Sequence, residues 1–193
     1  MARRQVIGAL VLSFVVGAVI SAQGPAGVDL NGRSTDPLDS AGMRVTVLLF
    51  TRTDCPIANR LMPAIERLRA DYEPRGVRFW LVFVDPAESV AAIRTHLNTH
   101  DQHASAIRDP RHELVRMTGA TRTPEAAVFV HEGPRSRLIY RGRIDNRYAD
   151  VGRARPKATS HDLQNAIDSA LSGGAAATPR ITQPVGCIIA DLG

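Results

Sequence analysis

The chain of 193 residues is 44% hydrophobic and 22% charged, proportions that are typical of a globular protein and exclude a largely disordered one. Its length suits one domain of ordinary size with a proper hydrophobic core. The formal net charge is +5, but the basic residues are scattered and few aromatic residues lie among them. This pattern favours a solvated, Arg-rich surface over a nucleic-acid interface.

The N-terminal segment, residues 1–22, has the pattern of an export signal. Arg3 and Arg4 precede an apolar run over residues 6–22 that ends in small residues, and we expect cleavage after Ala22. The run is close to the lower length limit of a membrane-spanning helix, so a retained anchor is the alternative. In both cases we expect the globular part to be periplasmic or secreted, and to contact a membrane only if the segment is retained.

The rest of the chain alternates strand-like and helix-like patterns. Residues 28–33 predict a strand that runs into an Asn-Gly turn, and the apolar run over residues 45–50 predicts a buried strand. From Pro56 the apolar residues recur at helical spacing, so we expect a helix that ends near Gly76. The elements expected next are a strand over 77–84, a helix over 89–100, a strand over 104–108, a helix over 111–118, strands over 126–131 and 137–141, and a helix from 159 or 160 to 171. This alternation predicts the α/β class, with a central sheet flanked by helices.

Two boundaries divide the chain after the export segment. We expect residues 28–171 to form one domain. Residues 172–182 are mostly small and include a proline, which is typical of a flexible connector. We therefore interpret residues 172–193 as a flexible C-terminal tail that carries Cys187.

Cys55 is the leading candidate for chemistry because of where the predicted elements place it. It follows the strand that ends at Phe50 and stands directly before Pro56, the first residue of the predicted helix. Backbone N–H groups and the positive end of the helix dipole stabilise a thiolate there, and can lower a thiol pKa from about 8.5 to roughly 3.5–7.5. A buried structural cysteine is the alternative, since free cysteines are often core residues.

Three features in this order resemble the thioredoxin-like superfamily, and within it the redoxin branch of alkyl hydroperoxide reductase and thiol-specific antioxidant proteins. Cys55 opens a helix after a hydrophobic strand, Pro63 follows eight residues later, and Thr123-Pro124 precedes a strand-like segment. The resemblance covers residues 28–171. It implies a thioredoxin-like fold with a central mixed β-sheet, an N-terminal hairpin and a cis peptide bond before Pro124, beside the active cysteine.

The chain departs from the patterns of such proteins at three positions. Ala58 stands where a dithiol motif has its second cysteine, so no disulfide can form within the motif. Asn59 replaces the second thiol that copper-chaperone relatives need, which removes a metal ligand. Arg52 stands where peroxiredoxins carry Thr or Ser, so the peroxide-reducing pattern is incomplete.

Cys187 is the only cysteine in the chain besides Cys55, and two cysteines in an exported protein suggest a disulfide. One interpretation makes Cys187 a resolving thiol on a mobile tail, which attacks a sulfenic acid or a mixed disulfide at Cys55. A second makes the pair a static bridge that pins the tail, and a third keeps the two thiols apart. The sequence leaves all three open.

The resemblance also suggests which residues bind substrate. The backbone before Pro124 would align an extended substrate against Cys55, Arg52 or Arg122 would stabilise its thiolate, and Thr53 would hydrogen-bond the sulfur. The expected substrate-binding set is Thr53, Pro56, Arg122, Thr123 and Pro124.

Three histidines raise the question of a metal site. His96, His100 and His103 are spaced for one face of a helix, a pattern that can bind copper or zinc. Exposed histidines near a helix end are the commoner case, and we expect no metal site and no cofactor.

Two functions therefore remain. The first is an exported thiol–disulfide oxidoreductase or peroxiredoxin-like antioxidant protein that uses Cys55, with Cys187 or an external thiol completing the cycle. Its partners would be protein or small-molecule thiols and disulfides, or a hydroperoxide. The second is a non-catalytic thioredoxin-like binding module with a structural Cys55–Cys187 disulfide.

Overall fold

The computed structural model describes residues 26–39, 42–133, 135–174, 176 and 178–190, and the predicted export segment lies outside them. The helices are α1 (Pro56–Tyr72), which continues into a 3-10 turn (Glu73–Arg75), α2 (Val90–Thr99), α3 (Glu113–Thr118) and α4 (Asp162–Leu171). Within these residues no helix is long and apolar enough to cross a membrane.

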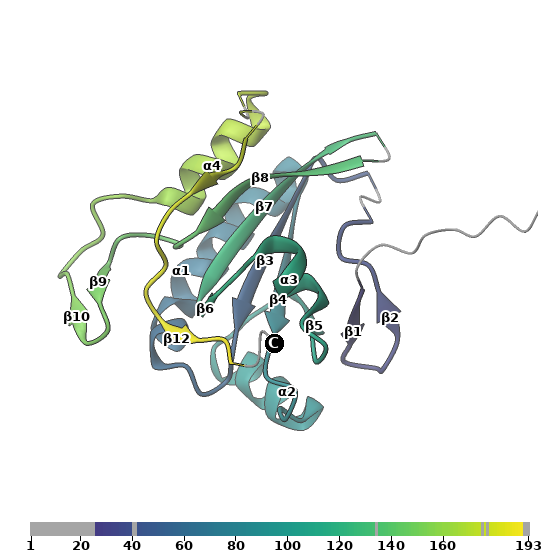
Figure 1. The fold of residues 1–193 in the computed structure, drawn as a ribbon, viewed down its shortest axis with the longest axis vertical. Helices are drawn as coiled ribbons and strands as arrows, with labels where there is room; N and C mark the ends of the chain where they lie inside the picture. The colour runs from purple at the N-terminus through teal and green to yellow at the C-terminus, as the bar shows by residue number, and fades with distance from the viewer. Residues whose placement is uncertain (1–25, 40–41, 134, 175, 177, 191–193) are drawn as a thin grey trace, which may run out of the picture.

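The strands form one large sheet and two small ones (Figure 1). They are β1 (Gly27–Asp29), β2 (Ser34–Thr35), β3 (Val45–Thr51), β4 (Val77–Phe83), β5 (Ser105–Arg108), β6 (Arg122–Thr123), β7 (Glu125–Glu132), β8 (Arg135–Gly142), β9 (Tyr148–Asp150), β10 (Arg153–Ala154), β11 (Arg180–Ile181) and β12 (Cys187–Ile188). The eight-stranded sheet has the order β11-β8-β7-β3-β4-β5-β1-β2, while β9 pairs with β10 and β6 pairs with β12. This mixed sheet with flanking helices confirms the predicted fold class.

The central strand β3 carries the core on both of its faces. It runs parallel to β4 and antiparallel to β7, and all seven of its residues are buried. Val47 and Leu49 pack with apolar residues of α1 and α4, whereas Leu48 and Phe50 pack with those of α3. Figure 1 shows α1 behind the sheet and α3 in front of it. Burial on both faces explains why this segment is a continuous apolar run and not an alternating one.

Most predicted elements are present with small shifts of their ends. The N-terminal hairpin is formed by β1 and β2, which pair antiparallel. The predicted helix over 111–118 begins later, at Glu113, because His112 has a left-handed backbone with φ of 53°. Asp109 still stabilises the start of the helix, because its carboxylate accepts hydrogen bonds from the N–H groups of Glu113 and Val115.

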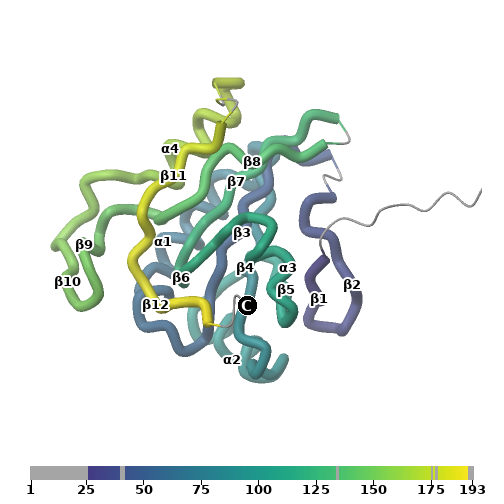
Figure 2. The backbone as a smooth tube through the Cα atoms, in the orientation of Figure 1, coloured from purple at the N-terminus to yellow at the C-terminus, as the bar shows by residue number. Residues whose placement is uncertain are grey.

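The described part of the C-terminal tail contains two short strands that the sequence analysis does not predict. β11 runs parallel to β8, and β12 pairs antiparallel with β6. Figure 2 shows the tail passing from the end of α4 along one side of the molecule to β6. Strands of two residues next to Gly and Pro carry no hydrophobic period, and the sequence therefore gives no sign of them.

Candidate functional site

Cys55 lies where the sequence places it, at the junction of a strand and a helix. β3 ends at Thr51, a short turn follows, and Cys55 is the N-cap of α1, with φ of −82° and ψ of 108°. Its carbonyl accepts the first helical hydrogen bond from the N–H of Asn59, at 3.0 Å. Pro56 is the first helical residue and is exposed beside the cysteine. The sulfur therefore lies at the amide-rich end of a helix of 17 residues.

A half-buried carboxylate fixes the turn before Cys55. The Oε1 atom of Glu88 accepts hydrogen bonds from the Thr53 N–H at 2.6 Å and from the Thr53 hydroxyl at 2.9 Å. The side chain of Asn59 donates to the carbonyl of Thr53 at 2.9 Å. Burial raises the pKa of Glu88 above its usual range. Sequence reasoning missed Glu88, because only the fold brings it to the turn.

Two residues that we expected to stabilise the thiolate have other partners. The hydroxyl of Thr53 donates to Glu88, and the guanidinium of Arg52 donates to Asp54 at 3.1 Å and to Asp85 at 3.0 Å. Neither Thr53 nor Arg52 is thus directed at the sulfur. The turn before the cysteine is a network of carboxylate contacts instead.

The proline loop lies directly beside Cys55, as the resemblance implies. The Thr123–Pro124 peptide bond is cis, and the Cys55 thiol donates to the carbonyl of Thr123 at 3.0 Å. Glu125 is only 1% exposed and accepts from the N–H groups of Thr121 at 2.7 Å and Arg122 at 3.1 Å. This carboxylate fixes the course of the loop.

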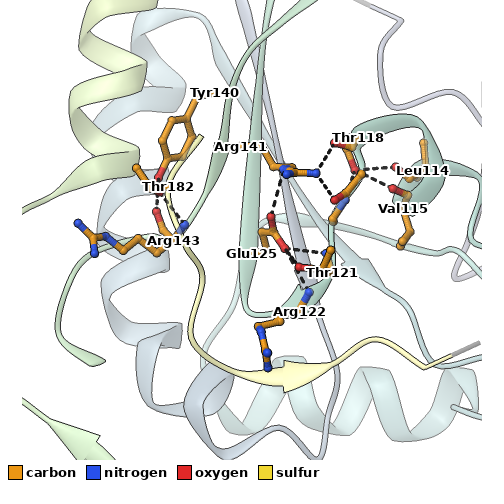
Figure 3. A network of polar contacts seen from close by, with 12 residues as sticks. Leu114, Val115, Thr118, Thr121, Arg122, Glu125, Tyr140, Arg141, Arg143 and Thr182 are labelled. Atoms are coloured by element: carbon orange, nitrogen blue, oxygen red, sulfur yellow. Dashed lines mark hydrogen bonds and ion pairs between the residues drawn. The ribbon is translucent and has the colours of Figure 1, made fainter. Parts of the chain in front are cut away.

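Arg141 links the proline loop to the end of α3 (Figure 3). Its guanidinium pairs with Glu125 at 3.4 Å and donates to the carbonyls of Thr118 and Gly119. Sequence reasoning missed both members of this pair. A carboxylate at the start of an apolar strand, directly after Thr123-Pro124, was the available signal.

Cys187 contacts Cys55, which lies 132 positions earlier in the sequence. The two Sγ atoms are 2.8 Å apart, both cysteines are free, and the Cys187 thiol donates to the Cys55 sulfur. The pairing of β12 with β6 sets Cys187 opposite Thr123 and Ile188 opposite Arg122. The structure therefore excludes the interpretation in which the two thiols lie apart.

The two thiols differ in acidity. Burial opposes ionisation of Cys55, but the hydrogen bond from Cys187 and the backbone N–H groups of Ala58 and Cys187 favour its thiolate, and the net effect lowers the pKa of Cys55. Burial, and then the hydrogen bond donated to Cys55, raise the pKa of Cys187. Cys55 is thus the thiol that ionises first.

The three histidines do not form a common face. His96 is buried with its Nε2 atom 2.8 Å from Asn59 Oδ1, and burial followed by the charge of His100 lowers its pKa to about 4. His103 lies instead beside Glu66, with Nδ1 3.0 Å from Oε1. Among the described residues, no group of three or more His, Cys, Asp or Glu is arranged to hold a metal ion.

Two cavities lie away from the sulfur atoms. One, of about 500 Å³, lies between α1 and the segment over residues 144–161. A smaller one of about 190 Å³ lies next to the end of the tail, where Ile189 faces Arg52, Asp85 and His112. Cys55 itself is fully buried, in contact with Cys187 of the tail and Thr123 of the proline loop.

Solved structures with this fold come from several bacteria. A hypothetical protein from Sinorhizobium meliloti 1021 is 21% identical, with a TM-score of 0.69 over 87% of this chain and 91% of that chain. An uncharacterized conserved protein from Geobacillus kaustophilus is 22% identical, with a TM-score of 0.71 over 87% and 88%. A secreted Mycobacterium tuberculosis disulfide oxidoreductase, described as homologous to E. coli DsbE, is 16% identical, with a TM-score of 0.51 over 77% and 94%. At these identities the likeness shows the fold.

A search of curated proteins finds no match to this chain. The model of the AhpC/TSA family matches residues 21–141, which include the strand before Cys55, the helix after it and the proline loop. The chain therefore belongs to the AhpC/TSA family of redoxins, within the thioredoxin-like fold.

Proposed function

We propose that this protein is a dithiol–disulfide oxidoreductase in which Cys55 attacks and Cys187 resolves. The Cys55 thiolate attacks a disulfide of the substrate, forms a mixed disulfide and expels one substrate thiolate, which takes a proton from water. Cys187 then gives up its proton and attacks the Cys55 sulfur, which releases the second substrate thiol. The substrate gains two electrons and the protein ends with a Cys55–Cys187 disulfide, which an external thiol or dithiol donor reduces again.

The observation that carries this proposal is the contact between the two sulfur atoms at 2.8 Å. A resolving thiol must reach the attacking sulfur, and the pairing of β12 with β6 places Cys187 in contact with it. The difference in acidity assigns the roles, because the thiol with the lowered pKa is the one that attacks near neutral pH.

The proline loop supplies the surface on which a substrate lies. In the proposal the backbone of Thr123 and the ring of Pro124 align an extended segment, and Arg122 holds one of its carbonyls. Pro56 is exposed at the rim, and Thr53 acts through the turn that it forms with Glu88. We assign these roles from the positions of the four residues and Thr53 around the sulfur of Cys55.

Peroxide reduction is supported less well by the geometry. A peroxide oxygen needs hydrogen-bond donors directed at the cysteine, and Arg52 and Thr53 donate to carboxylates instead. A disulfide substrate needs only a thiolate and a backbone edge, and this chain offers both. We therefore propose disulfide exchange, in preference to peroxide reduction, as the activity of this protein.

We also propose that the protein is exported. The pattern of residues 1–22 supports this, as does the secreted relative with the same fold. A free dithiol in an oxidising compartment needs a donor that keeps it reduced. Fractionation of cells that produce the full chain tests the localisation: export predicts a shorter form in the periplasm or medium.

The experiment for the main proposal compares Cys55→Ser and Cys187→Ser in the reduction of a disulfide-bonded model protein by dithiothreitol. We expect Cys55→Ser to lose all activity, and Cys187→Ser to accumulate a mixed disulfide through Cys55. The competing function is a binding module with a static bridge, favoured by the complete burial of Cys55. A Cys55–Cys187 disulfide that survives dithiothreitol under native conditions would decide for that module.

A further inference from the structure

The C-terminal strand occupies the backbone edge that faces Cys55. β12 and β6 form a two-stranded sheet of their own. Beyond this sheet the N–H of Ile189 donates to the carbonyl of Thr121 at 3.0 Å, and the side chain of Arg122 donates to the carbonyl of Gly186 at 3.0 Å. Residues 186–189 thus run antiparallel along β6, and Cys187 contacts the sulfur of Cys55.

The position before this cysteine accepts only a very small residue. A Cβ atom on Gly186 would lie 2.0 Å from the carbonyl oxygen of Thr123 and 2.7 Å from its carbonyl carbon. Both are backbone atoms, which cannot rotate away as a flexible side chain would. Any side chain here would push the strand off β6.

The position two residues after the cysteine accepts an apolar side chain. Ile189 is 3% exposed and belongs to the apolar cluster that contains Leu48 and Phe50, whereas its neighbour Ile188 is 66% exposed. The segment is therefore read as a pattern of four positions: a small residue, a cysteine, an unselected residue and a branched apolar residue.

We propose that residues 186–189 are a tethered mimic of the partner, and that β6 binds an extended protein segment with this same pattern. This rests on the proposed function of Cys55. A partner strand and the tail cannot occupy β6 together, because Cys55 is fully buried while Cys187 lies on it. The tail must leave β6 before a partner disulfide reaches Cys55, and must return to deliver Cys187 afterwards.

The test uses the full chain with Cys187→Ser, in which Cys55 is the only thiol and the tail retains a side chain of similar size. Ile189→Ala and Gly186→Ala are added separately to weaken the docking of the tail. Ile188→Ala removes the same atoms as Ile189→Ala from an exposed position. Gly174→Ala is the control for glycine, because a Cβ there would lie an ordinary 3.4 Å from its nearest neighbour, Ser169.

Two rates are measured in each variant. The first is alkylation of Cys55 by iodoacetamide, which reports release of the tail. The second is the reaction of Cys55 with synthetic hexapeptides, Pro-Val-Gly-Cys-Ile-Ile and Pro-Val-Val-Cys-Ile-Ile, whose cysteine is activated as a disulfide with thionitrobenzoate. Far-UV circular dichroism confirms folding in every variant.

We expect Ile189→Ala and Gly186→Ala to raise both rates by about tenfold or more, and the two controls to leave them within about twofold. In the opened variants the peptide with Gly before the cysteine should react faster than the peptide with Val. Equal alkylation rates in Ile189→Ala and Ile188→Ala, or equal rates for the two peptides, would overturn the inference. Alkylation of Cys55 without reaction with any peptide disulfide would instead refute the proposed function, and the alkylation rates would still decide whether the tail covers Cys55.

Discussion

The tail docks at two points, and they are held by different forces. At the upstream point, Arg180 pairs with Asp162 at 2.9 Å, and Asp162 is 1% exposed. The hydroxyl of Thr182 lies 2.6 Å from the hydroxyl of Tyr140 (Figure 3). A Cβ on Gly142 would lie 2.2 Å from the carbonyl oxygen of Thr182, so the two backbones are in close contact there.

At the downstream point, at β6, residues 186–189 of the tail carry no charged side chain. This point consists of backbone hydrogen bonds, the hydrogen bond from the Arg122 side chain to the carbonyl of Gly186, the contact between the sulfur atoms and one buried apolar side chain, that of Ile189. Separating the upstream point would remove Arg180 from the buried carboxylate of Asp162 and Thr182 from the hydroxyl of Tyr140, whereas separating the downstream point would mainly expose one isoleucine. The comparison predicts that the tail pivots near Thr182, with its upstream end staying attached while its downstream end leaves β6.

The largest expected effect is loss of the upstream point in Asp162→Ala. Its buried carboxylate accepts from Arg143 at 2.7 Å as well as from Arg180, so the substitution should lower the free energy of unfolding by about 3 kcal/mol. Arg180→Ala should cost less than about 1 kcal/mol, because the side chain of Arg180 is 59% exposed. Urea unfolding measures both, and equal costs would contradict the buried, polar character of this point.

Acid should destabilise the region around Cys55, where the downstream point of the tail docks, before it destabilises the upstream point. Since the pKa of His96 is lowered to about 4, its neutral form is favoured by folding, and stability is lost as pH falls from about 6.5 toward 4. The pKa of Asp162 is lowered from 3.8, so the upstream pair contributes its stability above that value and loses it only at lower pH.

We expect the wild-type protein to lose about 2 kcal/mol more than His96→Gln between pH 7 and pH 4.5 in urea unfolding. His96 supports the turn before Cys55 through Asn59, which connects this loss to the downstream point. His103→Gln is the control, because the side chain of His103 is 60% exposed. If His103→Gln changes the pH dependence as much as His96→Gln, the assignment to His96 is wrong.

Amide hydrogen exchange compares the two docking points directly. The N–H groups of Thr182 and Ile189 each donate to a backbone carbonyl at 3.0 Å, so a difference in exchange reports the opening of the two points and not the length of the bonds. We expect the amide of Ile189 to exchange about tenfold faster or more, after correction for intrinsic rates. Equal protection would mean that the tail opens as one unit.

The smallest expected effect is on the acidity of Cys55. Cys187→Ala removes the hydrogen bond that lowers the pKa of Cys55 most strongly, so this pKa should rise. The absorbance of the thiolate at 240 nm, followed against pH, measures it, with Ile188→Ala as the control. An unchanged titration would show that the helix end alone sets the acidity.

The parts of the site that are local in sequence could be predicted, and the parts that depend on distant segments could not. Cys55 before Pro56 predicts the start of a helix from neighbouring residues. The cis peptide bond between Thr123 and Pro124 was expected from the resemblance alone, because such bonds are rare. The meeting with Cys187 depends on the close approach of Gly186 to β6, which no local pattern indicates. Glu88 was missed for the same reason, since it reaches the turn before Cys55 only through the fold.

The hydrophobic periodicity of the sequence predicted the long helices and strands. Elements too short to show a periodicity were not predicted. β3 and α1 extend over enough residues to show a clear pattern, and both were predicted almost to their ends. The strands of two residues, β6, β11 and β12, were not predicted, because a backbone edge or a single contact defines them. Two of these short strands contribute to the candidate site, β6 with Arg122 and Thr123 and β12 with Cys187.

The short strand β11 has a consequence for solubility. It is the outermost strand of the large sheet and pairs with β8 at Tyr140 and Arg141. The other half of β8 carries Arg135 and Arg137, charges of the kind that keep neighbouring molecules from adding a strand. A chain that ended before Arg180 would expose the edge of β8 around Tyr140, and we expect such a chain to self-associate. The tail is thus expected to limit pairing between the sheet edges of two copies of the protein.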